Sequence, residues 1–178
     1  MRWGIIPAFH RGAAKDWKAA TFNARSETVE QLRTFRNIWR RNRCLIPVSG
    51  YYEWHRPDGV PKKQPPQPYY FTARDGAPIL TVAGIWDRWT NPEDGRELRS
   101  CAMMITEPSA FVAEVHDRMP VLLRTDQFDA WLGGAAGKET LMPAAEDMLA
   151  KRPVSKRINS SRTAKHDPTL IEPVALAA

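Results

Sequence analysis

The sequence predicts an α+β domain in which β-strands predominate. Short runs of β-branched and aromatic residues follow one another from residue 43 to residue 105, separated by turn signals such as Asp75-Gly76. This succession is typical of a meander of antiparallel strands. Far fewer segments show the apolar spacing of a helix. A chain of 178 residues is expected to form one domain that needs neither disulfides nor a metal to be stable.

The strand predictions rest on apolar runs bounded by glycine, proline or polar turn residues. They cover residues 3–6, 44–47, 51–55, 69–73, 79–86, 98–105, 121–123 and 154–159. Residues 56–68 hold five prolines, two lysines and an Asp-Gly turn, which predicts an exposed hairpin loop.

Helices are predicted where a capping residue precedes apolar residues at helical spacing. Thr28 opens a capping-box pattern, and the spacing that follows predicts a helix over residues 29–39. Thr106 as cap and Pro108 in the first turn predict a second helix that ends near residue 115.

Two further helices are predicted in the C-terminal part of the chain. Thr125 caps the first, which ends at Gly133-Gly134 because glycine readily takes the left-handed conformation that stops a helix. The second covers residues 138–150 and is interrupted by Pro143. From Ser160 onward we expect a loose tail.

The positive charge is concentrated at the N-terminal end. The net charge is +6, and residues 1–43 alone carry ten Lys and Arg against three acidic residues. Such a local excess suits a polyanion such as nucleic acid. A solvated basic face without a partner is the alternative that composition leaves open.

Composition also argues against several classes of protein. Cys44 and Cys101 do not make a disulfide framework, which favours a reduced, cytosolic chain. Four single, scattered histidines show no metal-ligand spacing, and no nucleotide-binding glycine motif is present, so no metal or cofactor is expected. No apolar run approaches the roughly 20 residues of a membrane span.

Three polar stretches carry the candidate chemistry. Asn23–Thr28 places an amide, a guanidinium, a hydroxyl and a carboxylate within six residues, which is denser than a connecting loop requires. Gly50–Trp54 embeds one carboxylate in aromatics, and Val115–Pro120 offers an imidazole beside an arginine. We expect Asn23, Arg25, Glu53 and His116 to converge on a phosphate-bearing substrate.

Glu53 is a candidate general acid and base. If strand alternation holds, Tyr51, Glu53 and His55 share one face, while Tyr52 and Trp54 share the other. Aromatic surroundings raise the pKa of a carboxyl group by desolvation, which suits proton transfer near neutrality. A surface glutamate on an edge strand is equally compatible with the sequence.

His116 lies at a predicted helix-to-strand junction, where functional side chains are common. Taken alone, it fits better as a C-terminal histidine that complements the helix dipole. Phe9 and Trp17 lie in a basic loop and are candidates for stacking on a base, whereas the tryptophans in apolar runs are expected in the core. The latter are Trp39, Trp86, Trp89 and Trp131.

Taken in order, these stretches resemble the SOS response-associated peptidase (SRAP) family, the abasic-site processing proteins of bacteria and eukaryotes. The matching segments are Arg2–Pro7, Asn23–Thr28, Arg43–Pro47, Gly50–Trp54, Lys63-Gln64, Ala83–Trp86 and His116–Pro120. The resemblance runs to about Asn159, so it predicts a family domain over residues 1–159 and a C-terminal tail over 160–178. It implies a β-rich fold around a barrel-like sheet, with a basic groove for single-stranded DNA.

The resemblance also implies roles for individual residues. Asn23 and Arg25 would hold the phosphates that flank an abasic sugar, with Asn23 in the catalytic set. Glu53 would shuttle protons, and His116 would assist Schiff-base chemistry and contact phosphate. The remaining DNA contacts would come from Trp3, Phe9, Trp54 and Arg118.

Family members form a covalent thiazolidine with the abasic sugar through an N-terminal cysteine that self-processing exposes. This chain begins Met1-Arg2-Trp3, so we expect the nucleophile and the first strands of the sheet to be absent from it. Cys44 and Cys101 are no substitutes, because the thiazolidine needs amine and thiol on one residue. A non-covalent single-stranded DNA binder and an inactive remnant are the alternatives. The expected protein is a cytoplasmic monomer, associated with the nucleoid when bound to DNA.

Overall fold

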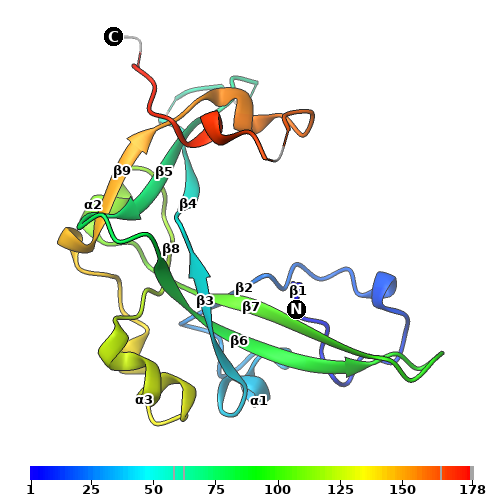
Figure 1. Cartoon of the computed structure of the whole chain (residues 1–178). Helices are drawn as coiled ribbons and strands as arrows, with labels where there is room; N and C mark the ends of the chain where they lie inside the picture. The colour runs from blue at the N-terminus through cyan, green and yellow to red at the C-terminus, as the bar shows by residue number, and fades with distance from the viewer. Residues whose placement is uncertain (58, 62, 165, 177–178) are drawn as a thin grey trace. The chain divides into compact units, whose positions relative to one another are not determined.

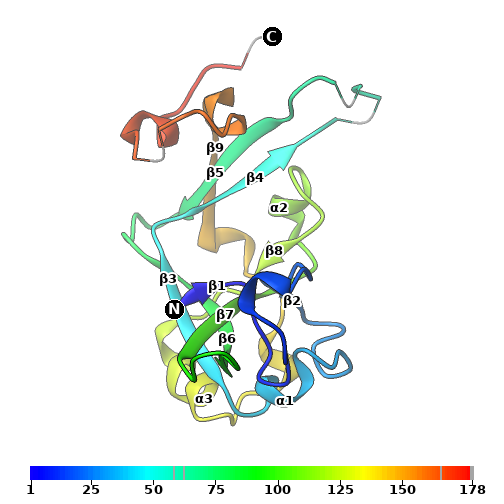
Figure 2. The same cartoon turned by 90° about the vertical axis from the view of Figure 1, so that its right-hand side faces the viewer.

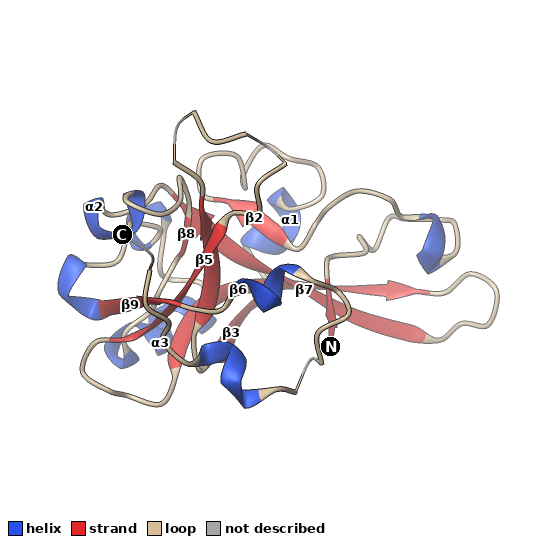
Figure 3. Cartoon of the chain, turned by 90° about the horizontal axis from the view of Figure 1, so that it is seen from above, coloured by secondary structure: helices blue, strands red, loops and turns tan. Residues whose placement is uncertain are grey.

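The computed structural model of the chain describes residues 1–57, 59–61, 63–164 and 166–176. They fold as two compact units (Figures 1 and 2). Unit 1 comprises Met1–Pro47, Thr81–Glu107 and Met119–Pro143, and unit 2 comprises the segments between and after them. The helices are short and the strands predominate in the described residues (Figure 3), which confirms the predicted α+β class.

Unit 1 is built on a mixed sheet whose central strand is β7, Glu97–Thr106. β7 pairs antiparallel with β6 and parallel with both β1 and β2. β3 lies beside β6, and β8 pairs with the last residues of β7. The bounds are β1 Arg2–Trp3, β2 Asn23–Arg25, β3 Arg43–Val48, β6 Leu80–Thr90 and β8 Met119–Pro120. The β6–β7 hairpin is the part of the predicted meander that this sheet confirms.

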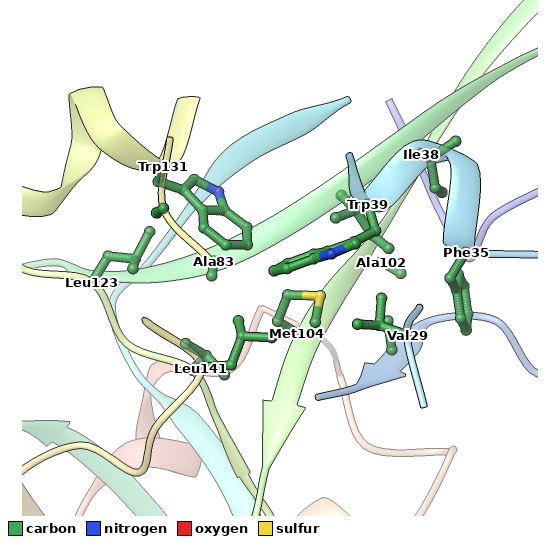
Figure 4. Packing of buried hydrophobic residues seen from close by; sticks show 14 of the residues in the cluster. Val29, Phe35, Ile38, Trp39, Ala83, Ala102, Met104, Leu123, Trp131 and Leu141 are labelled. Atoms are coloured by element: carbon green, nitrogen blue, oxygen red, sulfur yellow. The ribbon is translucent and has the colours of Figure 1, made fainter. Parts of the chain in front are cut away.

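The core of unit 1 packs against this sheet (Figure 4), and the buried Trp39 and Trp131 belong to it as expected. Arg43 lies between these two rings, with its guanidinium carbon 4.4 and 4.5 Å from their centroids. Its Nη1 donates to the carbonyl oxygen of Ala136 at 2.5 Å, and its Nε donates to that of Trp39 at 3.1 Å. Burial lowers the pKa of Arg43, and these acceptors and rings are what stabilise the buried cation.

Unit 2 is built on a three-stranded antiparallel sheet in the order β4-β5-β9. The bounds are β4 Tyr51–His55, β5 Gln67–Ala73 and β9 Leu149–Pro153. Tyr51 is paired with Phe71, and Phe71 is paired in turn with Lys151. The loop predicted over residues 56–68 is confirmed up to residue 66, apart from positions 58 and 62, which lie outside the described residues. Its last two residues, Gln67 and Pro68, instead belong to β5, and Pro68 is buried. Both sheets are open within the described residues, so the expected barrel-like sheet is not closed.

The predicted helix over residues 29–39 is wrong in its first part. Residues 27–35 form a succession of turns, and only Arg36–Trp39 is helical, as α1. Val29, Phe35 and Trp39 are all buried, so the apolar spacing was a signal of burial. Successive turns can bury the same positions as a helix, which is why the spacing misled.

The two helices predicted next are shorter than expected. They are α2, Ala110–Ala113, and α3, Phe128–Leu132, which a 3-10 turn at Thr125–Gln127 precedes. Gly134 has a φ of +79°, so glycine stops α3 in the left-handed conformation as predicted.

The predictions beyond residue 137 are largely wrong. No helix spans 138–150, where the described chain has 3-10 turns at Lys138–Thr140 and Glu146–Met148 and then β9. The predicted last strand, 154–159, is shifted to β9, because pairing with β5 selects the register. Residues from Ser160 onward include a 3-10 turn at Pro168–Ile171 and a bridge between Val154 and Pro173. The division of the chain at residue 159 stays a prediction.

Candidate functional site

Glu53 and His116 come together within unit 2. Glu53 lies in the middle of β4, and His116 follows α2, with its backbone N–H donating to the carbonyl oxygen of Val112 at 3.0 Å. The Glu53 Oε2 and the His116 Nδ1 are 3.6 Å apart. The side chain of Glu53 is only 18% exposed and that of His116 is 36% exposed. A fully solvated edge-strand glutamate does not fit this burial.

Strand alternation along β4 follows the prediction. Tyr51 stacks on Phe71 of β5, with centroids 5.0 Å apart and an interplanar angle of 7°, and His55 meets Tyr69 edge to face. These contacts define the face that carries Glu53. The opposite face carries the aromatic rings of Tyr52, Trp54 and Tyr70.

Burial raises the pKa of Glu53 to about 7. The charge of His116 acts against this shift, and the carboxylate of Asp117 adds to it. A carboxyl group with this pKa is present in both protonation states at neutral pH, so it can accept a proton in one step and return it in another.

The imidazole ring of His116 is oriented by the segment that follows it. The backbone N–H of Arg118 donates to the His116 Nδ1 at 3.1 Å. The same Nδ1 lies 3.3 Å from the carbonyl oxygen of Arg118, so the Arg118 backbone offers it a donor and an acceptor and orients the ring in either neutral tautomer. The Asp117 Oδ1 lies 3.4 Å from the same Nδ1, on a side chain that is 89% exposed. The sequence analysis missed Asp117, although its adjacency to His116 was a signal.

Tyr51 adds a buried hydroxyl on the Glu53 face. This oxygen is buried and has no hydrogen-bond partner among the described residues. Burial first, and then the charge of Glu53, raise the pKa of Tyr51. An unsatisfied buried hydroxyl costs about 1–3 kcal/mol, so the group is a candidate donor to a ligand.

We predict that Tyr51→Phe raises the free energy of unfolding of the DNA-free protein by about 1 kcal/mol, because it removes this unpartnered hydroxyl and keeps the stacked ring. Urea denaturation at pH 7 measures the change. Tyr69→Phe, on the neighbouring strand, is the matched control. A loss of stability on Tyr51→Phe would show that the hydroxyl is satisfied in solution.

Asn23 and Arg25 lie in β2 of unit 1, on the side of the strand opposite the fully buried Ala24. The Oδ1 of Asn23 is buried without a hydrogen-bond partner in the described part of the chain. Arg25 is exposed. β2 therefore presents an amide and a guanidinium side by side. Convergence of this pair with Glu53 and His116 stays a prediction.

The aromatic residues that are candidates for DNA contact differ in how exposed their rings are to solvent. Trp3 is 46% exposed on β1, whereas the ring of Phe9 is covered by the guanidinium of Arg33, 4.3 Å from its centroid. Trp17 contacts Phe9 edge to face. In unit 2, Trp54 donates from Nε1 to the Oδ1 of Asn159 at 2.6 Å. Of these candidates in unit 1, Trp3 is thus more accessible for stacking than Phe9.

In the part of the chain that the structure describes, no three His, Cys, Asp or Glu side chains gather as a metal site. None of the described helices is long and apolar enough to cross a membrane.

Residues 1–161 match the sequence model of the family described as SOS response associated peptidase (SRAP). The chain therefore belongs to the SRAP family, which confirms the resemblance seen in the sequence.

Its relatives include the abasic site processing protein YoqW of Bacillus subtilis, 32% identical over 97% of this chain and 75% of that protein. The abasic site processing protein HMCES of Xenopus tropicalis is 30% identical over 91% of this chain and 53% of that protein.

Solved structures show the same fold. A protein from Bordetella bronchiseptica, 33% identical, superposes with a TM-score of 0.76 over 86% of this chain and 75% of that chain. A protein from Bacteroides thetaiotaomicron, 24% identical, gives a TM-score of 0.84 over 97% of this chain and 75% of that chain.

Proposed function

We propose that this chain binds single-stranded DNA at abasic sites and transfers protons there through Glu53 and His116. The observation that carries the proposal is the buried Glu53 carboxyl, which has a pKa of about 7 and lies beside His116, in a chain of the SRAP family. We further propose that the protein acts as a monomer in the cytoplasm and associates with the nucleoid through DNA.

The Glu53–His116 pair suits the chemistry of an abasic sugar. Opening of the sugar ring to the aldehyde, and condensation of an amine with that aldehyde, both require a proton to be removed and returned. Glu53 can do both near pH 7, and the imidazole of His116 is a second proton-transfer group beside it. The second role proposed for His116 is a contact with DNA phosphate.

The DNA backbone is the proposed ligand of Asn23 and Arg25. The side-chain NH2 of Asn23 and the exposed guanidinium of Arg25 can both donate hydrogen bonds to phosphate. The excess of Lys and Arg over residues 1–43 adds attraction that does not depend on base sequence. Trp3, Phe9, Trp54 and Arg118 are the further proposed contacts.

Cysteine occurs in these 178 residues at positions 44 and 101. Burial raises the pKa of Cys44 to about 12 and also raises that of Cys101, so neither thiol is a ready nucleophile. The proposal therefore concerns DNA binding and proton transfer, and it assigns no covalent role to Cys44 or Cys101.

Gel shifts with a single-stranded oligonucleotide that carries one abasic site test the function, beside an intact oligonucleotide and a duplex. We expect a shift on native gels that is stronger for the abasic strand, and no adduct on denaturing gels. Equal shifts for abasic and intact strands would favour a general single-stranded DNA binder. A denaturing-stable band would mean that another group, such as a lysine, forms the linkage.

Arg25→Ala is expected to weaken binding of the abasic strand about tenfold, since it removes one charged hydrogen bond to phosphate. The slope of log affinity against log salt should become shallower by about 0.7 to 1. Fluorescence anisotropy between 50 and 300 mM salt measures both quantities.

Arg96→Ala is the matched control for Arg25→Ala. Arg96 is also exposed, but it lies just before the first residue of β7, whereas Arg25 pairs with Ile105 near the end of that strand. We expect a smaller loss of affinity for this variant. Identical salt slopes for wild type and Arg25→Ala would show that Arg25 does not contact phosphate.

A further inference from the structure

We infer that Lys151 is a positioning residue, which holds α2 and thereby His116 over the face of the sheet that carries Glu53. The inference rests on the proposed function of the Glu53–His116 pair. It concerns a residue of β9 that lies 35 positions beyond His116 and that no motif in the sequence singles out.

Lys151 lies on the same face of the three-stranded sheet as Glu53. It is paired with Phe71 of β5, and Phe71 is paired with Tyr51 of β4. Residues that are directly opposite in paired strands share a face, and so do residues two apart along a strand. Tyr51 is two residues from Glu53, so the row of Lys151, Phe71 and Tyr51 adjoins the catalytic carboxyl.

The ammonium group of Lys151 is directed at α2. Its Nζ donates to the carbonyl oxygen of Phe111 at 2.7 Å and to the Oε2 of Glu114 at 2.5 Å. It also lies 4.2 Å from the centroid of the Phe111 ring, which meets Phe71 edge to face. The Lys151 side chain is only 13% exposed, whereas that of Glu114 is 67% exposed. The bond to the Phe111 carbonyl oxygen is therefore the better shielded of the two and the main attachment of α2, because solvent screens the exposed ion pair.

The position of His116 depends on the position of α2. The helix has four residues, Ala110–Ala113, and a helix of one turn has little stability of its own. Its location therefore depends on packing and on Lys151. The carbonyl oxygen of Val112 accepts from the backbone N–H groups of both Val115 and His116, so the imidazole leaves α2 at a defined point. The side chains of Val112 and Val115 are also buried, so packing holds α2 and the residues that follow it in place.

Lys151 acts on Glu53 only through this geometry. The groups that set the pKa of Glu53 are its burial, His116 and Asp117, and Tyr51 is the further titratable group whose charge interacts with it. The ammonium of Lys151 is not among these causes. A change in Glu53 that follows a Lys151 substitution would therefore report movement of α2.

The experiment measures the titration of Glu53 and His116 by NMR in the full, DNA-free chain. Lys151→Met keeps the length of the side chain and removes its donors. We expect the apparent pKa of Glu53 to fall by about one unit toward 4.5, because water reaches the carboxyl, and the His116 resonances to shift. Lys151→Arg, which keeps charge and donors, should restore the wild-type values in large part.

Lys156 is an exposed lysine of the same unit, so Lys156→Met is the matched control. We expect Glu53 and His116 to titrate in this variant as they do in the wild type. If Lys151→Met does not fold, Phe111→Leu removes the ring under the ammonium and serves the same test. Wild-type titration in the folded Lys151→Met and Phe111→Leu variants would overturn the positioning role alone. A wild-type Glu53 that titrates near 4.5 would instead contradict the proposed function.

Discussion

Replacing Glu53 with glutamine is expected to stabilise the protein by about 3 kcal/mol at pH 8 and to change its stability little at pH 4.5. The folded-state pKa of Glu53 is about 7, against 4.5 for the unperturbed group. Each unit of difference corresponds to about 1.4 kcal/mol. Glutamine resembles the protonated carboxyl and does not ionise, so it removes the cost of burying a carboxylate.

The sign of this effect follows from proton binding. Between pH 4.5 and pH 7 the folded state keeps a proton on Glu53 that the unfolded state has released. The folded state then binds more protons, so the contribution of Glu53 to stability falls as the pH rises through this window. Below pH 4.5 both states are protonated and this loss is absent.

Urea denaturation of wild type and Glu53→Gln at pH 4.5, 6 and 8 gives the measurement. The acidic groups with lowered pKa values, among them Asp126 and Asp167, contribute equally to both proteins and cancel in the comparison. Glu172→Gln, an exposed glutamate of unit 2, is the matched control and should show no trend. A stability difference that is constant with pH would show that Glu53 has an ordinary pKa.

Gly50→Ala is expected to destabilise the protein by about 3 kcal/mol, at the upper end of what overpacking usually costs. A Cβ at position 50 would lie 2.4 Å from the carbonyl oxygen of Phe71 and 2.5 Å from the Cζ of Tyr70. The carbonyl belongs to the backbone of β5 and cannot move away without disturbing the pairing with β4. The β4–β5 pair carries Glu53, so the pH dependence of stability should weaken in the same variant.

Gly76→Ala separates this steric effect from the general cost of replacing a glycine. Gly76 has a φ of +80° and no atom within 4 Å of an added Cβ. Its substitution should cost about 1 kcal/mol, through backbone strain alone. Thermal and urea denaturation of both variants give the comparison. Equal losses of stability in the two variants would mean that the β4–β5 pair accommodates a Cβ at position 50 without a steric cost.

The sequence predicted well the features that depend on neighbours along the chain. The alternation of Tyr51, Glu53 and His55 along β4 is confirmed because side chains of any strand point to opposite faces in turn. Gly134 stops α3 because it is in the left-handed conformation, which is a local property of glycine. The motifs that led to the SRAP family are likewise short segments.

Errors appeared where long-range packing decided the backbone conformation. Residues 138–150 have helix-forming composition, yet Leu149–Pro153 becomes β9 because β5 offers it a partner. Residues 27–35 bury Val29 and Phe35 through turns, since contact with the core of unit 1 matters more there than helix propensity. Propensity is a weak local preference that tertiary contacts override.

The sequence by itself therefore determined the α+β class, the family and the residue types of the candidate site. Only the tertiary structure decided that Glu53 is buried beside His116, 63 positions away in the chain, and that its pKa rises to about 7. It alone also placed Lys151 against α2. The physical reason is that desolvation and ion pairing depend on groups brought together by folding, which no spacing along the chain records.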